Sequence, residues 1–126
     1  MGSANPVGVT LLGSTGSIGL STLDVIARHP GRFRVIALTA NNNVEKLAAQ
    51  CLQFQPRYAV MADADAADRL ALLLQQAAPD VDVLSGAEGL VRVAGLEAVD
   101  FVMAAIVGAA GLLPSLEAAR SGKRVM

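Results

Sequence analysis

The sequence contains no tryptophan, one cysteine, three phenylalanines and one tyrosine, and each of these shortages excludes a class of site. Cys51 alone can form neither an internal disulfide nor a cysteine-rich metal site. It occupies an apolar position of an expected helix, which predicts a buried thiol rather than a nucleophile. The few aromatic residues are too scattered to form a base-stacking platform.

Charge of one sign and long apolar runs are also missing. The net charge is −1, from 10 basic and 11 acidic residues spread along the chain, so we expect no nucleic-acid or anionic-membrane partner. Although 53% of the residues are hydrophobic, no apolar run reaches the roughly 18 residues that a membrane span needs. The N-terminus lacks the regions of a secretory signal. We therefore expect a cytoplasmic protein, and an alanine-rich chain without a transit peptide points to a bacterial source.

Strand-like and helix-like segments alternate along the chain. The expected strands are Val7–Leu12, Arg34–Thr39, Tyr58–Met61, Val81–Leu84 and Val99–Met103, with the beginning of another at Arg124–Met126. Helical spacing of apolar residues is found between them, first at Leu20–Ala27, then at Val44, Leu47, Ala48, Cys51 and Leu52, and again at Ala66, Leu70, Leu73, Leu74 and Ala77. Short links between the segments predict an α/β fold: a Rossmann-like, doubly wound parallel sheet with helices on both faces.

Local signals mark the ends of the expected helices. His29-Pro-Gly31 ends the first one, and Asp63 lies where a negative charge caps a helix N-terminus. The run from Ser85 to Glu88 has the spacing of a capping box. A last helix is expected through Leu113, Leu116 and Ala119, with Pro114 in its first turn and Gly122 as its stop.

The chain is expected to hold one domain, over residues 7–126. Residues 1–6 form an N-terminal tail, and its Met1-Gly-Ser start is typical of residues left by cloning. Because the sequence stops inside an expected strand, we interpret the domain as the N-terminal piece of a longer protein.

The run Gly13-Ser-Thr-Gly-Ser-Ile-Gly19 joins the first expected strand to the first expected helix. Gly13 and Gly16 leave no Cβ where the chain turns sharply and a phosphate must come close, and Gly19 lets the helix pack tightly. Thr15 and Ser17 add hydroxyl donors. In this strand–loop–helix context the pattern predicts a nucleotide site. The alternative is a tight turn that binds no ligand.

The end of the second expected strand indicates which nucleotide fits. Many NAD sites place a carboxylate there to hold the adenosine ribose diol, whereas this strand runs into Asn41, Asn42 and Asn43. The missing carboxylate permits a 2′-phosphate, to which the amides and the backbone N–H groups of a turn can donate. Lys46 is the nearest cation. The alternative is that Asn43 only caps the next helix.

The small-residue run from Met103 to Gly111 follows the fifth expected strand, where open α/β sheets bind ligands. Ala105 and Ile106 could line the ribose or nicotinamide side, or belong to a packing seam. His29 reads as a solvated helix end and Asp63 as a cap. We assign no catalytic and no metal-binding residue in this chain.

Several blocks of the chain, read together, go beyond a generic nucleotide fold. They are Gly13–Gly19, Ser21-Thr-Leu-Asp-Val25, Phe33-Arg-Val35, Ala37-Leu38, Pro56-Arg-Tyr-Ala-Val60 and Met103-Ala-Ala-Ile-Val-Gly-Ala-Ala-Gly-Leu-Leu-Pro114. The blocks resemble the start of the 1-deoxy-D-xylulose 5-phosphate reductoisomerase family, without an obvious gap over residues 7–126.

The resemblance implies an NADPH-binding Rossmann-like domain, followed in that family by a catalytic and a C-terminal helical domain. In the family, residues matching Thr15, Gly16, Ser17 and Ile18 bind the NADPH phosphates, and those matching Asn41–Asn43 surround the 2′-phosphate. Members often have glycine and a basic or small residue where this chain has its first two asparagines.

The activity that the resemblance implies is the rearrangement and reduction of 1-deoxy-D-xylulose 5-phosphate to 2-C-methyl-D-erythritol 4-phosphate, in non-mevalonate isoprenoid biosynthesis. The family's Leu-Ala-Asn-Lys-Glu-like signature would follow Met126, and its Mg or Mn carboxylates and substrate-phosphate loops are missing too. The chain by itself is therefore expected to bind the cofactor without turning over, and the full-length protein to be a homodimer.

Two alternatives stay open. The first is the cofactor domain of a semialdehyde-type dehydrogenase, which also has a G-x-T-G-x-x-G run but does not resemble the block after the fifth strand. The second is a non-catalytic Rossmann-like nucleotide-binding module.

The asparagine turn predicts a preference for NADPH over NADH of about 10–100-fold, because a few charge-assisted hydrogen bonds to the 2′-phosphate outweigh its desolvation. Replacing Asn41 with Asp should shrink or invert the preference, since a carboxylate repels the phosphate and accepts from the ribose diol. Paired titrations with both nucleotides at one ionic strength measure it. Equal affinities in the unmodified chain would contradict this interpretation of the turn.

Overall fold

A computed structural model describes residues 6–104 and 124–125 of the chain. Its elements alternate along the sequence as β1 (Val7–Leu12), α1 (Ser17–Arg28), β2 (Phe33–Ala40), α2 (Val44–Phe54), β3 (Tyr58–Met61), α3 (Ala64–Ala77), β4 (Asp82–Ser85), α4 (Gly86–Ala94), β5 (Phe101–Ala104) and β6 (Arg124–Val125). The strands form one sheet in the order β4-β3-β2-β1-β5-β6, and every pair is parallel.

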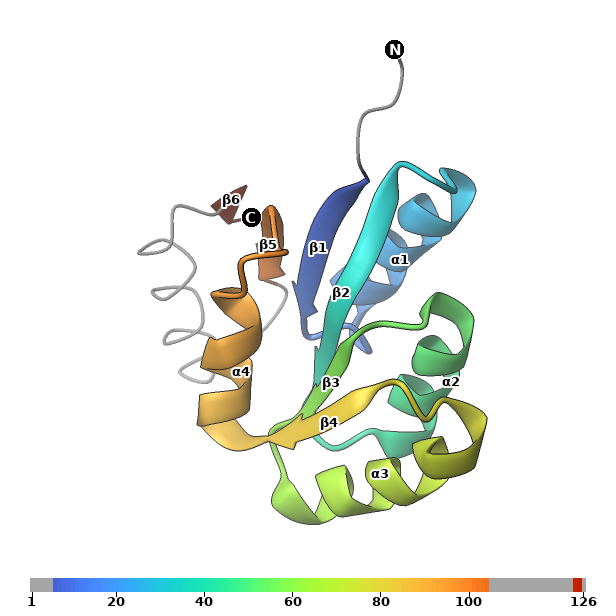
Figure 1. Ribbon diagram of the computed structural model, residues 1–126, viewed down its shortest axis with the longest axis vertical. Helices are drawn as coiled ribbons and strands as arrows, with labels where there is room; N and C mark the ends of the chain where they lie inside the picture. The colour runs from blue at the N-terminus through green and yellow to red at the C-terminus, as the bar shows by residue number, and fades with distance from the viewer. Residues whose placement is uncertain (1–5, 105–123, 126) are drawn as a thin grey trace.

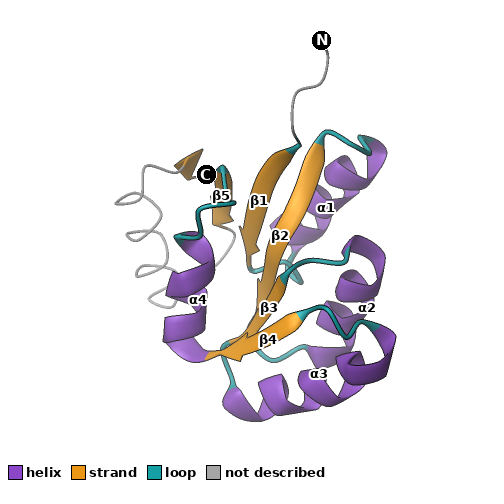
Figure 2. Cartoon of the chain, in the orientation of Figure 1, coloured by secondary structure: helices purple, strands orange, loops and turns teal. Residues whose placement is uncertain are grey.

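Helices cover both faces of this sheet, as predicted (Figure 1 and Figure 2). The connections from β1 through β4 move along the sheet in one direction and place α1, α2 and α3 on one face. The connection from β4 back to β5 moves the other way, so α4 lies on the opposite face. The expected α/β doubly wound architecture is confirmed.

Each face of the sheet has its own hydrophobic core. Side chains of β1 alternate between the two cores: Val9 and Leu11 face α1–α3, and Leu12 faces α4. Thr10, fully buried on the α4 side, satisfies its hydroxyl by donating to the Val93 carbonyl oxygen at 2.9 Å. The central strand is therefore buried on both sides, which is typical of parallel sheets.

An irregularity in β2 changes which of its side chains face each core. Val9 of β1 pairs with Val35 and Thr10 pairs with Ala37, so Ile36 is an extra residue in the ladder. Ile36 and Ala37 both belong to the core under α4, and the alternation resumes from there. The spacing of apolar residues along this strand does not predict the bulge.

The predicted boundaries hold with small differences that have local causes. The fourth strand begins at Asp82 rather than Val81, because Val81 closes a turn by donating to the Ala78 carbonyl. The fifth begins at Phe101 rather than Val99, because Val99 closes another turn on Leu96. The strand expected at Arg124–Met126 is found as Arg124–Val125, paired with β5.

The helix ends correct one prediction. Ser85 precedes α4 as expected, but its side chain makes no cap hydrogen bond. It is the last residue of β4, and Gly86 follows it at φ +75°, so the capping box does not form. Asp63 does cap α3, accepting from the Ala66 N–H at 3.1 Å, and His29 ends α1 as predicted.

Three expected core residues lie at the margin of their helix faces. Leu52 and Leu73 are 48% and 51% exposed, and Ala77 is exposed at the end of α3, whereas the other members of these faces pack inward. The helix expected around Leu113–Ala119 lies outside the described residues. The longest described helix, α3, has 14 residues, and no helix in the described ranges is long and apolar enough to cross a membrane.

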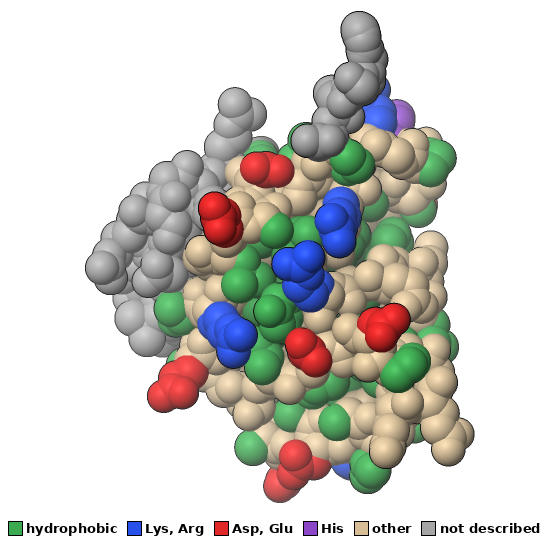
Figure 3. Space-filling view, in the orientation of Figure 1, with side chains coloured by type: hydrophobic (Ala, Val, Ile, Leu, Met, Phe, Trp, Pro, Cys, Tyr) green, Lys and Arg blue, Asp and Glu red, His purple; other side chains and the backbone are tan. Residues whose placement is uncertain are grey.

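Acidic and basic side chains lie interspersed over the face of the molecule that Figure 3 shows. A pair on α1, Asp24 and Arg28, is joined at 2.8 Å between exposed side chains. Such a pair contributes little stability, because solvent screens it. The fold therefore depends on its two cores rather than on surface charge.

Gly8 in β1 is a close-packed position that offers a test of this sheet. A Cβ there would lie 2.1 Å from the Ala98 carbonyl oxygen. We expect Gly8→Ala to lower the free energy of unfolding by about 1–3 kcal/mol, because backbone must move to relieve the overlap. Gly16→Ala is the control, since a Cβ at that position meets nothing closer than 3.8 Å. Chemical denaturation measures both, and a Gly8→Ala chain as stable as the control would contradict the packing.

Cys51 is fully buried, as predicted, and desolvation raises the pKa of its thiol from 9.0 to about 12. The folded state thus holds this proton more tightly than the unfolded chain does. The stability that it contributes is fully present below pH 9 and is lost as the pH rises toward 12, with a slope of at most about 1.4 kcal/mol per pH unit. Urea denaturation at pH 8 and pH 10.5 should show a larger alkaline loss for the natural chain than for Cys51→Ala. Identical losses would show that the thiol ionises without penalty.

Candidate functional site

The candidate site lies where the carboxyl ends of β1, β2 and β5 meet. From β1 the chain turns to one side, toward α1 and β2, whereas β5 joins the other side of β1 after a crossover on the opposite face. Leu12 at the end of β1 pairs with Ala104 at the end of β5. This is the point where strand order reverses, and open α/β sheets bind ligands in the crevice at such a point.

The loop between β1 and α1 has the backbone that its glycines predict. Gly13 lies at φ +87°, which strongly favours glycine. A Cβ on Gly19 would lie 2.4 Å from the Gly13 carbonyl oxygen and 2.6 Å from that of Ser14, so the first turn of α1 rests directly on the loop. Gly16 has φ −83°, which any residue can adopt. Its missing side chain leaves space rather than permitting an unusual conformation.

The N-terminus of α1 is left open for an anion. It begins at Gly16 with no side-chain cap, and its first turn carries no acidic residue. Every other described helix has at least one such feature: α2 and α3 are capped by Asn43 and Asp63, and α4 has Glu88 in its first turn. The first N–H groups of α1 therefore lack both an intrahelical acceptor and a side-chain acceptor, which is the arrangement that binds phosphate.

The side chains around this opening are accessible. Thr15 is half-buried, and Gly16, Ser17 and Ile18 are exposed. Backbone N–H groups and hydroxyls at one helix end can donate together to a pyrophosphate. The four residues predicted to bind the cofactor phosphates thus lie together at one exposed turn.

The sequence analysis missed the residues that hold this loop in place. Thr39, at the end of β2, accepts from the Gly13 N–H through its hydroxyl at 2.9 Å and from the Ser14 N–H through its carbonyl at 2.8 Å. Ser14 is fully buried and donates its hydroxyl to Gln50 of α2 at 2.6 Å. Gln50 is not among the apolar positions that predicted this helix, so no signal in the sequence indicated this contact.

The asparagine turn follows β2 at the same edge of the sheet. Asn41, Asn42 and Asn43 are all exposed. Asn43 accepts from the Lys46 N–H through its side-chain oxygen at 3.2 Å, so the capping interpretation of this residue is correct. Its amide nitrogen remains a donor in addition. The Asn41 carbonyl accepts from the Asp63 N–H at 3.2 Å, which ties the turn to the start of α3.

The remaining candidates either lie outside the described residues or are found away from this edge. Ala105 and Ile106 lie outside the described residues, although both directly follow β5. His29 is exposed and ends α1, so it lies at the opposite end of that helix from the glycine loop. Within residues 6–104 and 124–125, no group of three His, Cys, Asp or Glu side chains could hold a metal ion.

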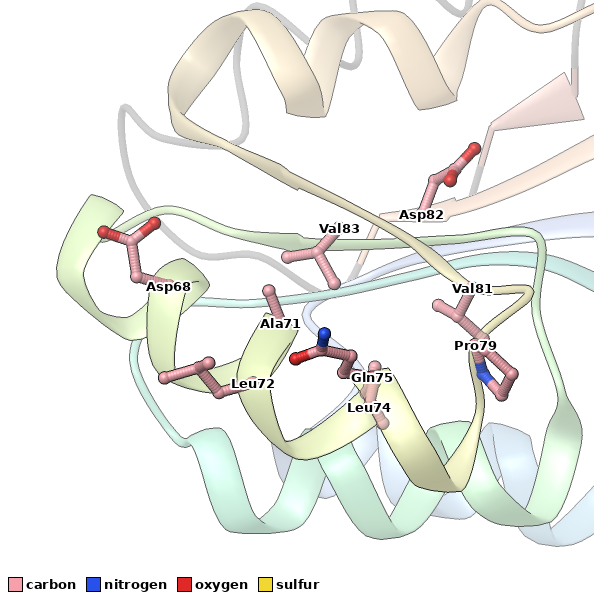
Figure 4. Close-up of a pocket in the computed structure, with 9 residues that line it drawn as sticks. All are labelled: Asp68, Ala71, Leu72, Leu74, Gln75, Pro79, Val81, Asp82 and Val83. Carbon is pink, nitrogen blue, oxygen red and sulfur yellow. The ribbon is translucent and has the colours of Figure 1, made fainter.

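A second hollow lies between α3 and β4, far from the glycine loop (Figure 4). It encloses about 590 Å³. Asp68 and Asp82 stand at opposite ends of the lining, with Gln75 between them. Two carboxylates disfavour a phosphate, and β3 and β2 separate β4 from β1. The hollow therefore does not belong to the candidate site.

Comparison with known proteins identifies the relatives of this chain. Residues 9–126 match the model of the family described as 1-deoxy-D-xylulose 5-phosphate reductoisomerase. The protein of that name from Nitrosomonas europaea is 61% identical over 118 residues, which are 94% of this chain and 29% of the relative. The one from Nitrosococcus oceani is 56% identical over 120 residues, 95% of this chain and 30% of the relative.

Solved structures of such enzymes have the same fold. The reductoisomerase from Zymomonas mobilis in complex with NADPH aligns with a TM-score of 0.89 and 45% identity, over 96% of this chain and 31% of that one. A complex of DOX-P reductoisomerase with NADPH, fosmidomycin and magnesium aligns with a TM-score of 0.91 and 46% identity, over 94% of this chain and 29% of that one. The chain thus spans about 30% of the length of the relatives it matches.

Proposed function

The chain belongs to the 1-deoxy-D-xylulose 5-phosphate reductoisomerase family, and from this premise we propose that it is the NADPH-binding domain of such an enzyme, over residues 7–126. The observation that carries the proposal is the uncapped, acid-free N-terminus of α1, which lies at the point where the strand order of the sheet reverses. Family membership also excludes the semialdehyde-type dehydrogenase alternative.

The proposed site divides the cofactor between two turns. Backbone N–H groups and hydroxyls of Thr15, Gly16, Ser17 and Ile18 would bind the pyrophosphate, with Gly13 turning the chain so that they face it. The site is charge-compatible, because the first turn of α1 has no carboxylate to repel the phosphates.

The second turn would bind the adenosine end of the cofactor. Asn41, Asn42 and the amide nitrogen of Asn43 would donate to the 2′-phosphate, since all three are exposed at the end of β2. None of the three carries a carboxylate that would favour a ribose diol instead. By their place after β5, Ala105 and Ile106 would line the ribose or nicotinamide side.

In the full-length protein the bound cofactor would supply the hydride for a reduction. We propose that this protein isomerises and reduces 1-deoxy-D-xylulose 5-phosphate to 2-C-methyl-D-erythritol 4-phosphate, acting as a cytoplasmic homodimer in isoprenoid biosynthesis. The relatives are bacterial enzymes of that name, and the solved complexes contain NADPH and magnesium. The divalent metal and the sugar phosphate would be held by the rest of the relatives' length, so the chain alone would bind NADPH without catalysis.

Gly16→Val tests the position of the pyrophosphate. The Cβ meets no close contact in the free protein, where only the Gly13 carbonyl oxygen lies within 4 Å of it, at 3.8 Å. The branched side chain would fill the space that the phosphates need, so we expect NADPH affinity to fall at least about 100-fold, equivalent to roughly 3 kcal/mol, in a folded chain. Calorimetric titration measures the affinity, and circular dichroism checks the fold.

The matched control is Ala49→Val, which adds the same branched side chain at an exposed position of α2. It should leave NADPH affinity within about two-fold of the unmodified chain, because it lies outside the loop. Unchanged affinity in a folded Gly16→Val chain would remove the glycine loop from the site. Failure of the unmodified chain to bind NADPH would overturn the proposed function itself.

A further inference from the structure

Ser14 is the one residue of the glycine loop whose side chain turns away from the proposed cofactor. Its hydroxyl is fully buried and donates to the Gln50 Oε1 atom at 2.6 Å. The Gln50 Nε2 atom in turn donates to the Ser14 carbonyl oxygen at 3.0 Å. The two residues therefore clasp each other through a pair of hydrogen bonds that joins the loop to α2.

Burial of the polar Gln50 side chain at this position carries a desolvation cost. It is only 7% exposed and lies one turn beyond Leu47 and beside Cys51, both fully buried in the core. Burial of an amide is unfavourable unless its hydrogen bonds are made, and here both ends of the amide are satisfied by Ser14. An apolar side chain would suit the core as well, so the amide is better explained by the geometry that it imposes on the loop.

The strand β2, which precedes α2, also makes hydrogen bonds to the same loop. Thr39 accepts from the Gly13 N–H at 2.9 Å and from the Ser14 N–H at 2.8 Å. Thr39 of β2 and Gln50 of α2 thus bind two consecutive loop residues from the two elements of one β2–α2 unit. The Asn41–Asn43 turn lies between them in the sequence of that unit.

We infer that Gln50, together with Thr39, is a positioning residue that sets the pyrophosphate loop relative to the asparagine turn. This inference rests on the proposed function. A single NADPH must reach both turns at once, so its 2′-phosphate contributes fully only while the spacing of the turns is held. Gln50 does not touch the cofactor; it acts through Ser14.

The inference makes Gln50 a determinant of cofactor choice as well as affinity. NADH has no 2′-phosphate for the asparagine turn to bind, whereas NADPH needs that turn in register with the loop. Loss of the clasp should therefore weaken NADPH more than NADH. A residue with a merely structural role would weaken the two nucleotides by the same factor and leave their ratio unchanged.

The test is Gln50→Leu, which removes both hydrogen bonds with little change in volume. Titrations of the chain with NADPH, NADH and adenosine 2′-monophosphate measure the whole site, the loop and the turn separately. We expect NADPH to weaken about 10-fold or more, because binding must then order a loop that is no longer held in place. The NADPH-to-NADH preference should fall at least several-fold, and adenosine 2′-monophosphate should bind unchanged. Gln53→Leu, at an exposed position of the same helix, should change none of the three.

A second variant covers the case in which Gln50→Leu does not fold. In Gln50→Glu the protonated carboxyl can donate to the Ser14 carbonyl and accept from its hydroxyl, whereas the ionised form cannot donate. The preference for NADPH, relative to the unmodified chain at the same pH, should be low at pH 8 and recover toward pH 5.5.

Two results would overturn the inference while leaving the proposed function standing. One is an equal loss of NADPH and NADH affinity in Gln50→Leu, and the other is no loss of either. Absence of the pH-dependent recovery in a folded Gln50→Glu chain would count against it in the same way. If the unmodified chain binds no NADPH, the proposed function fails, and this inference fails with it.

Discussion

Burial of β1 on both of its faces is the constraint on which the rest of this structure depends. Thr10, Leu11 and Leu12 have no measurable exposure, so neither face of the strand is left to solvent. A strand buried in this way requires two separate cores and hence helices on both sides of the sheet. It also requires a neighbour along each edge, which β2 and β5 provide. Close approach at Gly8, where a side chain would meet the Ala98 carbonyl, follows from the same crowding.

The same constraint creates the candidate site. A buried central strand can release the chain only at its ends, and at the carboxyl end two connections diverge to opposite faces of the sheet. The two connections leave a crevice between them at the ends of the strands, where open α/β sheets bind ligands. Gly13 makes the turn out of the strand with a positive φ, and Gly19 lets α1 begin directly on that turn. A helix N-terminus is thereby presented to the crevice with its backbone donors free.

The electrostatics of the candidate site depends on the absence of a side-chain cap and of acidic residues from the first turn of α1. Asn43 and Asp63 satisfy the first turns of α2 and α3, and acidic residues add to both, so those helix ends are neutralised internally. The first turn of α1 has neither, although a cap or an acidic residue there would stabilise the helix in isolation. The foregone stabilisation is explained if a ligand supplies the missing acceptors. Likewise, exposed amides rather than carboxylates follow β2, which keeps the edge of the sheet compatible with a second phosphate.

Most of the secondary structure was readable from the sequence, because it depends on local periods and on glycine and proline positions that act over a few residues. The element order, Cys51 burial, the Gly13 turn and the Asp63 cap were all predicted from such signals. The capping box at Ser85 was wrong, because the spacing of side chains says nothing of the left-handed turn at Gly86 that follows the strand.

Contacts between distant parts of the chain were decided only by the tertiary structure. The extra residue Ile36 shifts the register of β2 against β1. Ser14 and Gln50 meet although 36 residues separate them, and Asp100 accepts from the Gly8 N–H across 92 residues. Sequence alone determined that a glycine-rich turn follows β1 and an asparagine turn follows β2, since each is encoded within a few consecutive residues. That the two turns are braced into one unit was decided by packing, because a hydrogen bond between separate elements exists only once the sheet has brought them together.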